Sequence, residues 1–150
     1  MIEKANASLC KAIGLTSKLL GIYINENLQF GGLNLTRNQF IVLKILSDRQ
    51  GICQNELAFI TERDKTSLTR LISSLELKGM VTRKTASKDR RKKIINITEV
   101  GLNVLNEAWP IMTKLEDEVA KEITAEELES LLNVLDKVQA NVLSLDPVLE

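Results

Sequence analysis

The sequence of 150 residues predicts a mainly α-helical fold that carries one small β-hairpin. Most apolar residues recur three or four positions apart, which is the spacing of helices with a buried face. Residues 36–39 (Thr-Arg-Asn-Gln) and 124–127 (Thr-Ala-Glu-Glu) have the form of capping boxes, which mark the starts of helices. Residues 80–85 and 94–98 are typical of two strands, and the polar loop between them predicts a hairpin.

The first predicted helix, residues 5–28, is apolar on more than one side. Leu9, Ile13 and Leu20 lie on one face, while Leu15 and other aliphatic residues lie on another. A helix that is apolar nearly all round must be covered from several directions. We therefore expect a second subunit against it. The next helix begins at the first capping box and ends between residues 48 and 51.

A short helix over residues 54–60 and a longer one over residues 65–77 follow. Asp64 is placed to cap the longer helix, and Gly79 to end it in a left-handed conformation. A short helix, a tight turn and a second helix constitute a helix-turn-helix pattern. The hairpin that follows directly makes the pattern a winged helix-turn-helix. The inward face of the longer helix consists of Leu68, Leu71, Ile72 and Leu75.

Two helices complete the chain. The first runs from Thr98 and contains Pro110, which we expect to kink it because proline removes a backbone hydrogen bond. The second begins at the capping box of Thr124 and carries apolar residues at alternating spacings of three and four, as in a dimerisation seam. These residues include Leu128, Leu131, Leu135, Val138 and Val142. A stripe packed inside one chain is the alternative.

These elements predict three regions. Residues 1–34 supply an N-terminal dimerisation helix, residues 35–98 a winged helix-turn-helix domain, and residues 99–150 the C-terminal dimerisation helices.

The balance of 20 basic and 20 acidic side chains conceals a strong asymmetry. Residues 61–93 carry 11 basic and 4 acidic side chains, a net charge of +7. Residues 94–150 carry 3 basic and 12 acidic side chains, a net charge of −9. A basic segment that coincides with a winged helix-turn-helix indicates a nucleic-acid partner.

The missing histidine excludes several classes of function. Without an imidazole, neither a Ser-His-Asp nor a Cys-His catalytic site can form, and two cysteines are too few for an all-cysteine zinc site. No glycine-rich phosphate loop or paired-carboxylate motif is present, so we expect neither an enzyme nor a metal or cofactor. The sequence contains no apolar run long enough to span a membrane and no signal peptide, which favours the cytoplasm.

The outward face of the predicted 65–77 helix suits the major groove of DNA, because it is small, polar and basic. No acidic residue occurs between Lys65 and Glu76. Arg70 is the candidate for a bidentate contact to guanine. Contacts to bases or phosphates are expected from Lys65, Thr66, Thr69 and Ser73, and contacts to phosphates from Ser67, Gln54 and Asn55. The wing loop adds Lys88, Asp89, Arg90 and Arg91; a disordered basic loop is the alternative for this segment.

At these residues the chain resembles the MarR family of transcriptional regulators over nearly its whole length. The most specific stretches are Asn55 to Ala58, Asp64 to Arg70, Lys78 to Arg83, and the Asp-Arg-Arg of residues 89–91 followed by Thr98 and Gly101. The resemblance implies a homodimer that binds a pseudo-palindromic operator in double-stranded DNA. We expect a repressor, and an activator is the alternative. The resemblance also implies that Asp89 pairs with Arg91, while Arg90 or Arg91 enters the minor groove.

The resemblance further implies modulation by a ligand or an oxidant. A small organic effector near Trp109, Tyr23 and the second helix is expected, but the sequence does not identify it. Two alternatives stay open: a winged-helix module that binds another protein without binding DNA, and a thiol-based redox sensor that uses Cys10.

Overall fold

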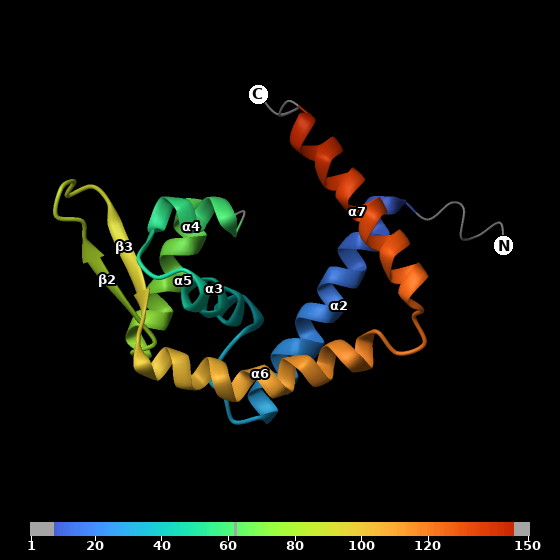
Figure 1. Cartoon of the computed structure of the whole chain (residues 1–150), viewed down its shortest axis with the longest axis horizontal. Helices are drawn as coiled ribbons and strands as arrows, with labels where there is room; N and C mark the ends of the chain where they lie inside the picture. Colours follow the sequence, from blue (N-terminus) through green and yellow to red (C-terminus); the bar gives the residue numbers. More distant parts are fainter. Residues whose placement is uncertain (1–7, 62, 146–150) are drawn as a thin grey trace. The chain divides into compact units, whose positions relative to one another are not determined.

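The computed structural model describes residues 8–61 and 63–145. It confirms a mainly α-helical fold with a small antiparallel sheet (Figure 1). In chain order the elements are α2 (Leu9–Phe30), α3 (Arg37–Asp48), β1 (Ile52–Cys53), α4 (Gln54–Ile60), α5 (Lys65–Leu77), β2 (Val81–Thr85), β3 (Lys93–Ile97), α6 (Glu99–Val119) and α7 (Ala125–Ser144).

The chain forms two compact units, one that ends at Leu115 and one that begins at Glu116. The division therefore falls inside α6, toward its C-terminal end. The hydrophobic core lies in the first unit, and α7 in the second unit has no buried residue. The domain boundaries expected at residues 34 and 98 stay predictions.

The sheet has the strand order β1-β3-β2, and both pairings are antiparallel. Strands β2 and β3 form the predicted hairpin, with Val81 opposite Ile97 and Thr85 opposite Lys93. Strand β1 was not predicted from the sequence; it consists of Ile52 and Cys53 alone and pairs with Ile95 and Ile94 of β3. This short strand fixes the start of α4 to the sheet, because α4 begins at the next residue.

The core cluster contains residues from α2, α3, α4, α5, α6 and all three strands. Of the four apolar residues expected on the inner face of α5, three are buried and Leu71 is half-buried. The side chains with no exposed surface at all include Leu28, Val42, Leu43, Leu46, Leu57, Leu68, Ile72, Leu75 and Ile95. Since these residues come from five different elements, α5 is fixed in place by packing on several sides.

The predicted helix starts are confirmed in atomic detail. The hydroxyl of Thr36 accepts a hydrogen bond of 3.2 Å from the N–H of Gln39, and the Gln39 side chain accepts one of 3.0 Å from the N–H of Thr36. Asp64 caps α5 through a 2.8 Å hydrogen bond from the N–H of Ser67. Gly79, with φ of +69°, ends α5 in the left-handed conformation that glycine favours.

The first predicted helix differs in extent, and the helix predicted from Thr98 begins one residue later. The first was expected from residue 5 to 28, and α2 covers Leu9–Phe30; residues 5–7 lie outside the described part of the chain. Helix α6 continues from Glu99 to Val119 with Pro110 inside it. Within the described residues, no helix is both long enough and apolar enough to cross a membrane.

Gln39 is the buried polar side chain of the core, with an exposed fraction of 5%. Its amide nitrogen donates to the Ser74 hydroxyl at 3.0 Å, and its oxygen accepts from the Lys78 ammonium at 3.0 Å. Lys78 also donates to the backbone oxygen of Asn34 at 2.7 Å. Burial lowers the pKa of Lys78. This network ties the C-terminal end of α5 to the start of α3, so the two helices are held together by polar as well as apolar contacts.

Candidate nucleic-acid interface

Helix α5 presents one polar, basic face to solvent. Because Leu68, Ile72 and Leu75 are buried on one side, Lys65, Thr66 and Arg70 are exposed on the other. In the part of the chain that the structure describes, none of these three side chains makes a hydrogen bond or ion pair. Their donors are therefore available to a partner molecule. Arg70 carries the guanidinium fork that matches the edge of guanine.

Gln54 and Thr69 form a polar bridge between the two helices of the helix-turn-helix. The amide nitrogen of Gln54 donates to the Thr69 hydroxyl at 2.9 Å, and that hydroxyl donates to the backbone oxygen of Lys65 at 2.6 Å. The side-chain oxygen of Gln54 is buried without a hydrogen-bond partner in the structure. Gln54 thus orients Thr69 on the exposed face, while Asn55, one residue later, is itself exposed.

Ser67 lies at the foot of α5 and is half-buried. Its hydroxyl accepts a hydrogen bond of 3.2 Å from the guanidinium of Arg63. Its backbone N–H belongs to the Asp64 cap. Ser67 is therefore part of the structure that fixes the first turn of α5.

Ser73 was expected to face outward, and its hydroxyl instead accepts a hydrogen bond from the wing. The donor is a guanidinium nitrogen of Arg83 on β2, at 2.9 Å, and Arg83 also lies 3.5 Å from a carboxylate oxygen of Glu76. Arg83 ends one of the motif stretches in the sequence, but no role was predicted for it. A signal was present, since residues alternate along a strand and Arg83 lies on the same face as the buried Val81.

The wing is the β2–β3 hairpin with its loop, residues 86–92 (Figure 1). In the loop, a carboxylate oxygen of Asp89 accepts a 3.0 Å hydrogen bond from the backbone N–H of Arg91. The resemblance implied a contact between the two side chains, whereas the observed contact is to the backbone. The contact of Asp89 to the backbone still holds the conformation of the wing loop, and the side chains of Lys88, Arg90 and Arg91 stay exposed.

Thr98 and Gly101 fix the base of the wing. The Thr98 hydroxyl donates to the backbone oxygen of Gly79 at 2.6 Å and accepts from the N–H of Gly101 at 3.1 Å. A Cβ atom on Gly101 would collide with the backbone oxygen of Met80 and lie 2.8 Å from a side-chain carbon of Ile97. Glycine is thus required where α6 passes the end of α5, and this explains the Thr and Gly of the sequence motif.

The candidate dimerisation residues are all at least partly exposed. On α2, Leu9 is exposed, and Ile13 and Leu20 are half-buried. On α7, Leu128, Leu131 and Val142 are exposed, and Leu135 and Val138 are half-buried. Cys10 is exposed near the start of α2, and Cys53 is half-buried in β1.

Two packed helices with a free basic face, followed directly by a basic hairpin, define a winged helix-turn-helix protein of the DNA-binding class.

Residues 35–93 match the model of the MarR family. The transcriptional regulator SlyA is 26% identical, with a TM-score of 0.80 over 91% of this chain and 94% of SlyA. A mutant of MarR from E. coli, solved with operator DNA, is 28% identical, with a TM-score of 0.80 over 87% of this chain and 92% of the other. The MepR–DNA complex from S. aureus has the same fold at 23% identity, with a TM-score of 0.82 over 89% of this chain and 98% of MepR.

The match over residues 35–93 and the likeness to SlyA and MarR support a winged-helix transcriptional regulator of the MarR family. The family assignment from the sequence is thereby confirmed. It agrees with the site, since the matched residues 35–93 contain both the α4–α5 pair and the loop of the wing.

Proposed function

We propose that two copies of this chain bind a pseudo-palindromic operator and repress transcription in the cytoplasm. The observation that carries the proposal is the exposed face of α5, which has no acidic residue between Lys65 and Glu76, beside a basic wing. A helix of this kind fits the major groove, and a basic hairpin fits the adjacent minor groove. Repression follows physically, because a dimer on its operator excludes other proteins from the same stretch of DNA.

The proposed roles of the individual residues follow their exposure. Arg70 reads a guanine, with Lys65, Thr66 and Thr69 on neighbouring bases or phosphates. Gln54, Asn55 and Ser67 contact phosphates or hold the groups that do. In the wing, Arg90 or Arg91 enters the minor groove, where the negative potential is strongest in narrow A·T-rich stretches.

The proposed homodimer rests on the apolar surface of α7 and α2. Helix α7 has 20 residues, and none of them is buried. Its large apolar side chains are therefore open to solvent, and Leu128, Leu131 and Leu132 are 42–52% exposed. An apolar row of this length on a helix marks an interaction surface. A second copy of the chain is the proposed partner, because a pseudo-palindromic site presents two half-sites and a two-fold dimer supplies two reading helices.

The proposed effector is a small organic molecule that binds in a pocket between α3 and α6. The pocket has a volume of about 300 Å³ and is lined by Lys44, Ser47, Leu102, Leu105, Asn106 and Trp109. The Lys44 ammonium lies 5.3 Å from the centre of the Trp109 ring. Trp109 lines this pocket, and Tyr23 does not. A panel of ligands can be screened through the fluorescence of Trp109, the only tryptophan of the chain.

The proposal is tested by measuring binding of the purified protein to DNA from upstream of its own gene and to scrambled DNA. A dimer that neutralises about eight phosphates gives a slope of about −7 for log K against log salt concentration. Between 50 and 200 mM salt the affinity should then fall about 10⁴-fold. The upstream DNA should bind more tightly than the scrambled DNA at both salt concentrations.

Salt-independent binding, or no binding to either DNA, would favour the alternative of a protein-binding winged-helix module. The redox alternative is tested in the same assay. If peroxide released the wild type from DNA but not the Cys10→Ser variant, Cys10 would be the switch.

A further inference from the structure

Thr69 lies on the exposed face of α5, yet its hydroxyl is already hydrogen-bonded inside the protein. The hydroxyl donates to the backbone oxygen of Lys65 at 2.6 Å and accepts from the side-chain nitrogen of Gln54 at 2.9 Å. The residue as a whole is nevertheless exposed. Thr69 therefore offers a partner molecule something other than a free hydroxyl.

The two hydrogen bonds limit what the Thr69 hydroxyl can do on DNA. A hydroxyl has a single hydrogen to donate, and that hydrogen is committed to Lys65. Phosphate oxygens, the N7 and O6 atoms of guanine and the O4 atom of thymine are all acceptors, so each of them needs a donor. The Thr69 hydroxyl therefore cannot bind any of these groups while its bond to Lys65 persists.

The orientation of Gln54 follows from the same arrangement. Because the Thr69 hydroxyl has given its hydrogen to Lys65, it can only accept from Gln54, and the amide nitrogen must face it. The side-chain oxygen of Gln54 is buried and has no hydrogen-bond partner among the described residues. A reversed amide would place two acceptors against each other, so the bridge between Gln54 and Thr69 has one stable orientation.

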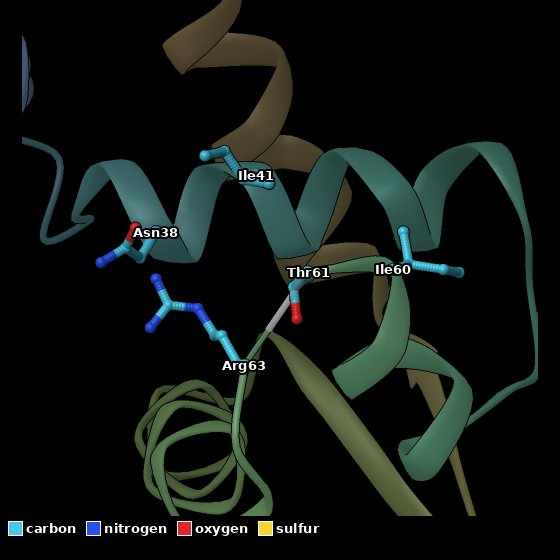
Figure 2. Close-up of a pocket in the computed structure, with 5 residues that line it drawn as sticks. All are labelled: Asn38, Ile41, Ile60, Thr61 and Arg63. Carbon is cyan, nitrogen blue, oxygen red and sulfur yellow. The ribbon is translucent and has the colours of Figure 1, made fainter. Parts of the chain in front are cut away.

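The turn between α4 and α5 keeps Gln54 and Thr69 at a fixed distance. The N–H of Arg63 donates to a backbone oxygen of α4 at 2.9 Å, and its guanidinium donates to the Ser67 hydroxyl on α5 at 3.2 Å. Figure 2 shows Thr61 and Arg63 of this turn beside α3. Since the turn is bonded to both helices, the hydroxyl of Thr69 stays enclosed between them.

The methyl group is the remaining part of the Thr69 side chain. It diverges from the hydroxyl on the same tetrahedral carbon, so it points away from the two hydrogen-bond partners. In the major groove, thymine is the base that carries a methyl group on its edge, and a threonine methyl is one of the apolar groups that can contact it. Such a contact removes apolar surface of both groups from water.

We propose that Thr69 reads the 5-methyl group of one thymine in each half-site through its own methyl group. The proposal rests on the proposed function, since it requires α5 to lie in the major groove. The hydroxyl takes no part in reading the base, because Lys65 and Gln54 hold it. Thr69 thus distinguishes thymine from cytosine by an apolar contact, whereas Arg70 reads guanine by hydrogen bonds.

Deoxyuridine is the probe, because it differs from thymidine only in lacking the 5-methyl group. The full-length protein first selects its tightest sequences from a library of random duplexes. Each thymine of the best duplex is then replaced singly by deoxyuridine, and fluorescence anisotropy gives the Kd. One thymine in each half-site should show a loss of about fourfold, as for one buried methyl group, and replacement of both should cost about 15-fold.

Two variants of Thr69 separate its methyl group from its hydroxyl. Thr69→Ser keeps the hydroxyl and lacks the methyl, so it should bind thymine and deoxyuridine at this position equally. Thr69→Val keeps a methyl and lacks the hydroxyl, so it should retain the roughly fourfold preference for thymine. Thr66→Ser is the matched control, because it removes the same methyl group three residues earlier on α5. The ratio at this thymine should then be that of the wild type.

Equal binding of every deoxyuridine duplex by the wild type would overturn the proposal, and this comparison needs no variant to fold. Such a result would leave the proposed function intact, because one sequence would still have been selected. A preference for thymine that survived in Thr69→Ser would overturn the proposal by assigning the contact to another residue. A preference lost in Thr69→Val would do the same by assigning it to the hydroxyl. A library in which no sequence is enriched would overturn the proposed function together with this inference.

Discussion

The guanidinium of Arg83, on strand β2 of the wing, donates a 2.9 Å hydrogen bond to the hydroxyl of Ser73 on α5. The Arg83 side chain is only 20% exposed, and its Nε atom is buried without a partner in the structure. The sheet and the hydrophobic core already join the wing to α5, and this hydrogen bond adds a direct contact between their side chains. The wing and α5 are the two parts that are proposed to enter neighbouring grooves of DNA. The geometry of this hydrogen bond therefore fixes the spacing between the wing and α5.

Replacement of Arg83 should loosen the wing from α5. We expect Arg83→Gln to reduce the free energy of unfolding by about 1–2 kcal/mol, because the Ser73 hydroxyl loses its buried donor. The contribution from Glu76 is small, since that carboxylate is half-exposed at 3.5 Å. Urea denaturation measures the loss. Amide hydrogen exchange in β2 should become faster at the same time.

Lys84→Gln is the control for Arg83→Gln, because it removes the same charge from the exposed face of the same strand. It should change stability by less than about 0.5 kcal/mol. A double-mutant cycle with Ser73→Ala should give a coupling energy near 1 kcal/mol. A coupling energy of zero would mean that the Arg83–Ser73 bond does not stabilise the protein.

Arg70 should determine preference at a single base pair. We expect Arg70→Ala to cost about 1–3 kcal/mol of binding free energy on the operator and much less on random DNA. Lys65→Ala should instead weaken binding to all sequences alike if Lys65 contacts phosphate, and it should lower the salt slope by about one unit per contact. Fluorescence anisotropy with operator variants measures both effects. Equal weakening of operator and random DNA by Arg70→Ala would remove its role in base reading.

The accuracy of the sequence prediction depends on how local each interaction is. The capping boxes at Thr36 and Thr124 and the Asp64 cap involve residues three apart, so residue types alone identified them. Strand β1 has two residues and forms only because β3, some forty positions later, pairs with it. No local pattern distinguishes such a pair from a loop.

The same limit applies to the candidate interface. Helical periodicity correctly placed Lys65 and Arg70 on the exposed face of α5, because three buried leucine and isoleucine side chains define the opposite face. It did not find the partners of Ser73 or Gln54, which lie 10 and 15 residues away on other elements. A hydroxyl on a helix can face solvent or a neighbouring strand, and tertiary packing decides between the two.

Gly101 should tolerate no side chain. The Cβ atom of Gly101→Ala would meet the backbone oxygen of Met80, which is itself held by a 3.0 Å hydrogen bond from the N–H of Thr98. The backbone at Gly101 or at Met80 must shift to relieve this contact. We therefore expect a loss of about 1–3 kcal/mol in unfolding free energy, despite the better helix propensity of alanine. Asn103→Ala, on the exposed face of the same helix, should not destabilise the protein. A Gly101→Ala variant as stable as the wild type would contradict the close approach.

The start of α7 should weaken at low pH. The Glu127 carboxylate accepts hydrogen bonds from the N–H of Thr124 at 2.9 Å and from its hydroxyl at 3.1 Å, and these bonds lower the pKa of Glu127. Because the pKa is lower in the folded chain, the stabilisation is complete above the unfolded value of about 4.3 and is lost as the pH falls through the folded value. An NMR titration of the Glu127 carboxyl carbon should show a midpoint below that of an ordinary glutamate.

Thr124→Ala provides the control for this titration, because it removes the hydroxyl and leaves the backbone N–H. The Glu127 midpoint should move part of the way back toward its ordinary value. If the wild-type midpoint were already ordinary, the capping box would not persist in solution.

The apolar row of α7 should hold two copies of the chain together. Leu131 is 49% exposed, and Leu135 and Val138 follow on the same side of the helix. A carboxylate at this position would be buried without a partner in a dimer, so Leu131→Asp should convert the protein to a monomer at micromolar concentration. Sedimentation measures this. Asn133→Asp adds the same charge two residues away on another face of α7 and should stay dimeric.

The loss of the dimer should also change DNA binding. Because a monomer has one reading helix, Leu131→Asp should bind a full operator no more tightly than a half-site. A Leu131→Asp protein that remains dimeric would exclude this row as the interface.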